Sequence, residues 1–175
     1  MSFALPALLR VDVSNLAASE SLLRQKSAPV VMIDSAIREL VGELRRVLAS
    51  IPHGAGLAAI QIGVPLQVAI VNAARTPESE IILINPRVLS ISGRLTWRRE
   101  GCLSLPDHAA PVRRRNTIVL ETLTLDGDVT TLKRRGFEAT VIQHEVDHMA
   151  GLFYWDRLED GTRPCVIEAA FDPTT

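Results

Sequence analysis

Apolar residues at helical spacing predict two helices in this chain. Asp34 and Ser35 can each cap the start of the first helix, and Pro52 ends it. Its apolar stripe consists of six residues: Ile37, Leu40, Val41, Leu44, Val47 and Leu48. The second helix is expected over residues 137–149, where Gly151 stops it. Because it is apolar on nearly every side, it should be buried at the centre of the fold.

Runs of apolar and β-branched residues between turn signals predict strands in the middle of the chain. These runs cover residues 66–72, 80–85, 117–125 and 129–132, and Asp126-Gly127 is a hairpin signal between the last two. Residues 1–33 show no clear pattern. We therefore expect an α+β fold in which mostly antiparallel strands pack around the buried helix. The whole chain, residues 1–175, should form a single domain, with a core at about 20–160 and a short tail at 159–175.

Composition excludes several classes of protein. Hydrophobic residues make up 47% of the chain and charged residues 22%, which is typical of a globular protein. A net charge of −1 argues against stable binding to nucleic acid or to a membrane surface. The two cysteines, Cys102 and Cys165, cannot build a disulfide framework. With no signal peptide or membrane span in view, we expect a cytoplasmic protein. We also expect it to be a monomer.

The second helix carries the strongest chemical signal, in residues 143–148. His144 and His148 are four residues apart and share one helix face, so they can bind the same metal ion. Glu145 flanks that ion, where a general base acting on a water molecule would stand. The alternative is a core helix whose histidines only make hydrogen bonds. The apolar surroundings make that alternative the weaker one.

A third metal ligand is expected from residues 100–104, which contain Cys102. A thiolate is a good ligand for Zn²⁺ or Fe²⁺, and three protein ligands leave one position open. Cys102 could instead be a buried free cysteine or a nucleophile paired with histidine. The nucleophile would be redundant beside an activated water.

Residues 54–61 are rich in glycine and alanine but lack the lysine of a phosphate-binding loop. We interpret Gly54, Ala55 and Gly56 as backbone that approaches a ligand closely, followed by a helical turn that aims Gln61. The carboxamide N–H of Gln61 could bind a developing oxyanion. On its own, this segment would more simply be a turn packed against a strand.

Taken together, residues 54–61, 100–104 and 143–148 resemble peptide deformylases, whose three signature motifs occur here intact and in order. The resemblance spans roughly residues 20–160. It implies that Cys102 and the two histidines bind one divalent metal ion per chain. Fe²⁺ is favoured, and Zn²⁺, Ni²⁺ or Co²⁺ can occupy such a site.

The resemblance also implies roles in catalysis. The reaction would be hydrolysis of the N-formyl group from formyl-methionine at the start of nascent polypeptides. Glu145 would take a proton from water and pass it to the departing amine. Gln61 and the backbone N–H of Leu103 would stabilise the oxyanion. The N-formylated peptide would add as a strand beside Gly54–Gly56.

The socket for the methionine side chain is expected along the second helix, from Phe137 and Val141, with the Thr140 hydroxyl making it slightly more polar. Ala109 stands where some members of the family carry an arginine near the peptide. A divergent deformylase for another N-formylated peptide or small molecule therefore stays open, as does a non-catalytic module that binds formylated peptides.

Arg114 could pair with Glu100 behind the metal site. Three basic clusters favour solvated strand ends over an RNA-facing patch, so only a transient ribosome contact is considered: Arg98-Arg99, Arg113-Arg114-Arg115 and Lys133-Arg134-Arg135. His53, His108 and Cys165 have no assigned role.

Overall fold

The structure, a computed structural model, describes residues 7–9, 20–158 and 165–166. Two α-helices, α2 (Ser35–Ser50) and α3 (Gly136–Met149), lie among seven strands of the described chain. The strands are β1 (Gly56–Ala58), β2 (Val68–Val71), β3 (Ile81–Ile84), β4 (Arg87–Cys102), β5 (Leu105–Leu123), β6 (Val129–Arg135) and β7 (Cys165–Val166). Short 3₁₀ turns occur at Ala59–Ile62, Pro77–Ser79 and Tyr154–Arg157.

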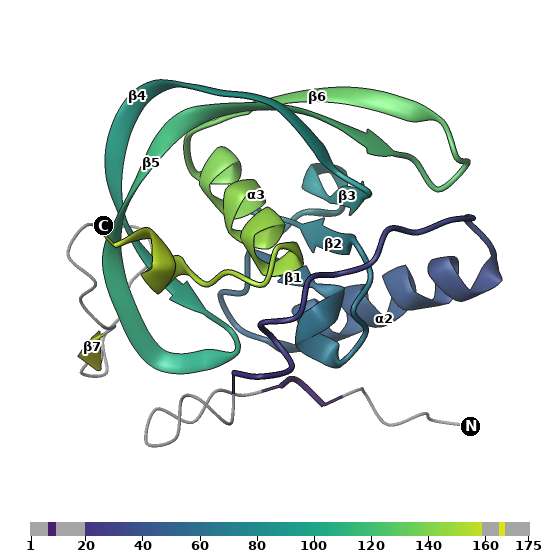
Figure 1. Cartoon of the computed structure of the whole chain (residues 1–175), viewed down its shortest axis with the longest axis horizontal. Coiled ribbons are helices and arrows are strands. Elements are labelled where there is room, and N and C mark those ends of the chain that lie inside the picture. Colours follow the sequence, from purple (N-terminus) through teal and green to yellow (C-terminus); the bar gives the residue numbers. More distant parts are fainter. Residues whose placement is uncertain (1–6, 10–19, 159–164, 167–175) are drawn as a thin grey trace.

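The strands form two antiparallel sheets, which confirms the predicted α+β class. One sheet has the order β1-β2-β3, and the other has the order β4-β5-β6 with the short β7 against β5. Strands β4 and β5 are long and arch around α3, which lies inside their curve (Figure 1). Among the described residues, no helix is both long and apolar enough to cross a membrane.

Helix α2 forms as the apolar spacing predicts. The Asp34 side chain caps its start by accepting a hydrogen bond from the backbone N–H of Ile37 at 3.1 Å. All six residues of the predicted stripe are buried. They pack against apolar residues of β1, β2 and β3 in one continuous cluster, so α2 covers one side of the smaller sheet.

Helix α3 confirms the prediction of a central buried helix. Ala139, Val141, Ile142 and Met149 belong to the main core cluster, together with residues from both sheets. Polar residues of this helix are buried as well, and these carry the site described below. Gly151 stops the helix with φ +75°, and a side chain there would collide with the backbone of Arg24.

The longest strands are where the sequence-based prediction was wrong. Strand β4 was missed, and β5 begins at Leu105 although a strand was predicted only from residue 117. Residues 87–95 are exposed on both sides of the strand, so no alternation of apolar and polar residues marks them. Strand β6 continues to Arg135 through three basic residues. The three-residue strand β1 lies inside residues 54–61, where the sequence predicted backbone close to a ligand and then a helical turn but no strand.

Strand pairing sorts the three basic clusters by the direction of their side chains. Residues paired across antiparallel strands share a face, and neighbours along a strand alternate. Five basic residues therefore face outward and are exposed: Arg99, Arg113, Arg115, Lys133 and Arg135. The other three face the interior: Arg98, Arg114 and Arg134. The prediction of solvated strand residues thus fits only the outward set.

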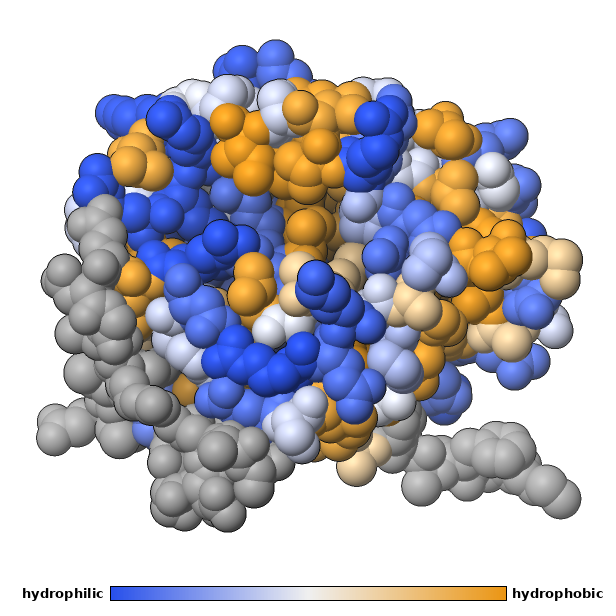
Figure 2. All heavy atoms as spheres, viewed as in Figure 1, coloured by the Kyte–Doolittle hydropathy of each residue, from blue (hydrophilic) through white to orange (hydrophobic). Residues whose placement is uncertain are grey.

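Hydrophobic side chains interrupt this charged surface. Figure 2 shows orange residues among blue ones along the upper edge of the molecule, where the β4–β6 sheet lies, and a hollow below that edge with hydrophobic residues in its depth. On the sheet itself Trp97 is 59% exposed, with the Arg113 guanidinium 5.3 Å from the centre of its ring.

Candidate metal centre

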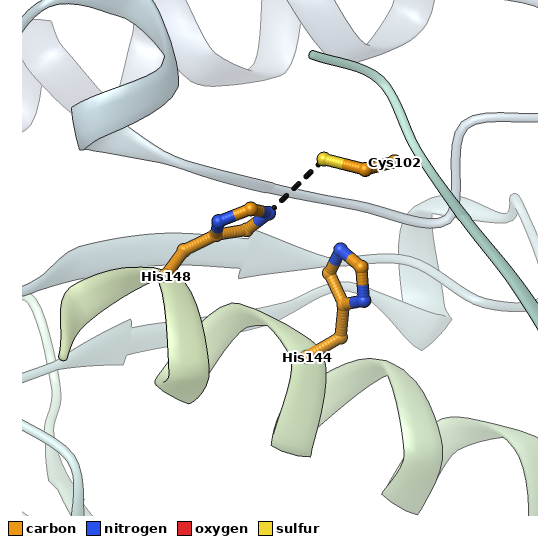
Figure 3. A group of neighbouring side chains, drawn as sticks. All are labelled: Cys102, His144 and His148. Atoms are coloured by element: carbon orange, nitrogen blue, oxygen red, sulfur yellow. Dashed lines mark hydrogen bonds between the residues drawn. The ribbon is translucent and has the colours of Figure 1, made fainter. Parts of the chain in front are cut away.

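Three predicted ligands from two distant segments converge. His144 and His148 project from α3, and Cys102 reaches them from the end of β4 (Figure 3). The Cys102 Sγ atom lies 3.2 Å from His148 Nε2, and the three ligand atoms all lie within 4.8 Å of one another. The four-residue spacing on the helix therefore places both imidazoles on the side that faces Cys102.

The donor set fits a divalent metal ion. In a tetrahedral site, a thiolate at about 2.3 Å and an imidazole at about 2.0–2.1 Å from the ion lie roughly 3.5 Å apart. The distance from Cys102 to His148 is close to that separation. Three ligands leave one position for water or substrate, which is the arrangement of a catalytic rather than a structural site.

A buried ion pair holds His144 in place. Glu100 Oε2 lies 3.1 Å from His144 Nδ1, which leaves Nε2 of that ring for the metal. Arg114 donates to both oxygens of Glu100, at 2.6 and 2.9 Å, so the pairing expected from the sequence is confirmed. Burial opposes ionisation of Glu100, but hydrogen bonds from His144 and Arg114 hold its pKa below the ordinary value.

Asp147 completes this network and was not singled out from the sequence. Arg114 donates to Asp147 at 2.8 Å, and Arg157 donates to the same carboxylate at 3.1 Å. Arg114, on β5, thus connects β4 to α3, because it binds Glu100 of β4 and Asp147 of α3. In the sequence, the only signal for Asp147 is its position between the two histidines of the helix motif. That position does not indicate that Arg114 and Arg157 are its partners.

Glu145 is positioned beside the three ligands and is 3% exposed. Its Oε2 atom is buried and has no hydrogen-bond partner among the described residues, so it is available to a ligand. A Cβ atom on Gly56 would lie 2.5 Å from Glu145 Oε1, so only glycine leaves room for this carboxylate. Burial, and the negative charge of Glu100, raise the pKa of Glu145 to about 7.

The pKa values of the two imidazoles are shifted in opposite directions. Burial opposes the charge of His144, but hydrogen bonds to Cys102 and Glu100 raise its pKa well above the ordinary value. Burial and the charge of His144 lower the pKa of His148 well below it. A metal ion requires both rings neutral, so binding competes with the proton on His144.

Gln61 reaches the site from the 3₁₀ turn after β1, as the sequence suggested. Its Oε1 accepts a hydrogen bond from the Ala58 backbone N–H at 2.9 Å, which fixes the amide. Its Nε2 lies 3.1 Å from Ser104 Oγ and 3.5 Å from Cys102 Sγ. The amide N–H groups therefore point toward Ser104 and toward the candidate ligand Cys102. Ser104 is the residue that sequence reasoning missed here.

The glycine segment borders both the metal ligands and a free strand edge. Strand β1 begins at Gly56 and pairs with β2, and its other edge pairs with none of the described strands. Val141 faces this segment, because a Cβ atom on Gly56 would lie 2.8 Å from Val141 Cγ1. A side chain at Gly54 would lie 2.8 Å from Leu48 and 3.6 Å from Leu103.

The three residues predicted for the methionine socket differ in exposure and in hydrogen bonding. Phe137 lies in the first turn of α3 and is 44% exposed, so its ring forms a rim rather than a closed wall. The Thr140 hydroxyl donates to the Gly136 carbonyl at 3.3 Å, which directs it toward the helix backbone. The polar contribution expected from Thr140 is therefore small, and Val141 is the buried apolar residue of the three.

Aromatic rings support the histidines from behind. The Tyr154 ring stacks on His144 with a centroid separation of 6.1 Å, and Phe153 meets His148 edge-on at 5.7 Å. Both aromatic residues are buried, and neither was singled out from the sequence. They lie just after α3, where no motif marks them.

The residues left without a role stay outside this cluster. His53 is exposed with φ +62°, and His108 Nδ1 lies 2.9 Å from the Pro106 carbonyl. Cys165 lies in β7, which pairs with residues 108 and 109 of β5. The remainder of the predicted tail lies outside the described residues.

Comparisons with known proteins agree with the geometry. The family model described as polypeptide deformylase matches residues 15–164. The peptide deformylase of Agrobacterium fabrum is 34% identical over 151 residues, covering 85% of this chain and 88% of that protein. The peptide deformylase of Syntrophobacter fumaroxidans is 37% identical over 146 residues, covering 82% and 85%. A crystal structure of a peptide deformylase from Synechococcus elongatus in complex with actinonin matches with a TM-score of 0.77 at 30% identity, covering 91% of this chain and 83% of that one.

Proposed function

This chain belongs to the peptide deformylase family, and from that premise we propose how its own residues carry out the reaction. The protein is a hydrolase that removes the N-formyl group from nascent polypeptides. The observation that carries the proposal is the convergence of Cys102, His144 and His148, together with the buried carboxylate of Glu145, whose Oε2 has no hydrogen-bond partner among the described residues.

Cys102, His144 and His148 are proposed to hold one divalent ion per chain. Bound there, the ion would supply Lewis-acid activation of the attacking water and of the formyl carbonyl. Fe²⁺ is the favoured occupant, and Zn²⁺, Ni²⁺ and Co²⁺ suit the same donors, since a thiolate with two imidazoles accepts several ions. Glu100 supports the set by orienting His144.

Glu145 is proposed as the general base and then the general acid. Its Oε2 is buried and has no hydrogen-bond partner among the described residues, and a carboxyl group whose pKa is near neutrality can both accept and return a proton. The carboxylate would take the proton of the attacking water and deliver it to the nitrogen of the departing amine. Formate and the free N-terminus are the products.

Gln61 is proposed to bind the oxyanion together with the backbone N–H of Leu103. The Gln61 amide is buried and held by Ala58 and Ser104, so its N–H groups are oriented before the substrate arrives. Donors fixed in advance stabilise developing charge without a cost of reorganisation.

The formylated peptide is proposed to lie extended along the open edge at Gly54–Gly56, with its first side chain beside Val141 and Phe137. A main-chain pairing of this kind is independent of the peptide sequence, which suits an enzyme that acts on many nascent chains. Glu145 and Gln61 are not needed to hold a metal, so their placement argues against a non-catalytic binding module.

The setting of this reaction is proposed to be the cytoplasm, where nascent chains begin, with the protein acting as a monomer. A transient contact with the ribosome stays a prediction. The outward basic set would make it, and reversing the charge of Arg115 and Lys133 should then weaken co-sedimentation with ribosomes in low salt. Unchanged co-sedimentation would reject this contact.

Metal analysis tests the ligand set. Protein purified anaerobically, loaded with Fe²⁺ or Zn²⁺ and dialysed is expected to retain one ion per chain, and Cys102→Ala is expected to lose most of it. Cys165→Ala changes the other cysteine of the chain and serves as the matched control. Full metal content in Cys102→Ala would show that this thiol is not a ligand.

A further inference from the structure

Arg98 points into the interior beside the proposed peptide site, although its sequence context suggested a solvated residue. In the β4–β5 pairing it lies opposite Val112, which is buried, and it shares a face with Glu100 two residues later. Its neighbour Arg99 pairs with Pro111 and faces outward. The two arginines of this cluster therefore have different environments.

Helix α3 runs past this face of β4. Glu100 meets His144 at 3.1 Å, and the Arg98 guanidinium lies 5.9 Å from the centre of the Phe137 ring. Phe137 and His144 are about two helical turns apart, with Val141 between them. The metal ligands thus lie at one end of this strand–helix contact, and Arg98 lies with Phe137 at the other.

Val141 connects this contact to the substrate edge. It faces Gly56 at the open edge of β1, as does Glu145. On the proposed function, a peptide whose formyl group is at the metal ligands directs its first side chain along Val141. The end of that side chain then reaches toward Phe137 and Arg98.

The interior arginines differ in how their donors are used. Arg114 donates to Glu100 and Asp147, and Arg134 pairs with Glu138 at 3.0 Å. Arg98 Nε is buried and has no hydrogen-bond partner in the described part of the chain. Since a guanidinium is always charged and only donates, a buried N–H of this kind favours an acceptor brought by a ligand.

We propose that Arg98 is a specificity-determining residue that recognises an oxygen acceptor at the end of the substrate's first side chain. Two groups supply such an oxygen at about the same distance from Cα. They are the sulfoxide of an oxidised formyl-methionine and the carboxylate of a formyl-glutamate. Both are similar in length to methionine, so each fits where the methionine thioether would lie. This inference rests on the proposed deformylase function and adds the substrate class.

Formate release from four peptides tests the inference. They share the sequence after the first residue, which is formyl-methionine, formyl-methionine sulfoxide, formyl-glutamate or formyl-norleucine. Norleucine has the same length and no acceptor, so the ratio of kcat/KM for each oxygen-bearing peptide to that for norleucine isolates the contact. Arg98→Leu is expected to lower both ratios about tenfold or more, while activity on formyl-norleucine is kept. The two oxygen-bearing peptides are compared separately, so they show which source the site prefers.

Arg99→Leu is the matched control, because the adjacent arginine faces outward, and it is expected to leave both ratios unchanged. If formyl-methionine is still hydrolysed, equal ratios in Arg98→Leu and the wild type would overturn this inference and leave the proposed function standing. A drop of the same size in Arg99→Leu would also overturn it. Failure of the wild type to release formate from any of the four peptides would overturn the proposed function and this inference with it.

Discussion

Replacing Glu145 with glutamine is expected to lower kcat/KM for a formyl-methionine peptide by about 10²–10⁴-fold, the range for loss of a general acid–base group. Glutamine keeps the shape that fits against Gly56 but cannot accept a proton. Because the change removes a buried carboxylate, one oxygen of which has no hydrogen-bond partner in the described part of the chain, folding stability should not fall. Formate release and metal content are measured on the same preparation.

Glu138→Gln is the matched control on the same helix. Glu138 is partly exposed and pairs with Arg134 at 3.0 Å, away from the metal ligands, so its loss should leave formate release almost unchanged. Activity of Glu145→Gln within a few-fold of the wild type, with metal bound, would show that another group moves the proton.

The second large effect is expected from Arg114→Leu. The Arg114 side chain is 5% exposed and neutralises two carboxylates that are also buried, Glu100 and Asp147. Breaking a buried ion pair from one side leaves uncompensated charge, which costs about 3–5 kcal/mol of unfolding free energy. For a chain of this size, the melting temperature should fall by on the order of 10 °C. Thermal unfolding followed by circular dichroism measures the change.

Arg87→Leu provides the comparison. Arg87 pairs with Glu121 at 2.6 Å, but its side chain is 70% exposed, and exposed pairs contribute roughly 0.2–1 kcal/mol. Arg114→Leu should also weaken metal retention against a chelator by about 10–100-fold, because Glu100 would no longer be held against His144. Equal loss of stability in the two variants would contradict the role given to this buried network.

The chemistry of the site was largely predictable from the sequence because it resides in short segments. The four-residue spacing of His144 and His148 fixes one helix face whatever the rest of the fold does. Three motifs in order identified Cys102 as their partner, and the structure brings its sulfur to 3.2 Å from His148. The pairing of Glu100 with Arg114 was also expected, from the resemblance to the family and not from a predicted strand, and Arg114 donates to both oxygens of Glu100.

The remaining features depend on strand pairing, which local patterns do not encode. Residues 87–95 are exposed on both faces, so β4 has no period-two signal. Without the register of β4 against β5, the sequence does not show that Arg98 faces inward and Arg99 outward. Phe153 and Tyr154 likewise reach the histidines only because the chain folds back after α3.

The most direct test of this account is formate release from a formyl-Met-Ala-Ser peptide by protein purified anaerobically. Release would be measured with Fe²⁺, with Zn²⁺ and after complete chelation. The account predicts release that disappears on chelation and returns when a divalent ion is added back. Undiminished release from metal-free protein, or none from protein with one ion bound, would contradict it.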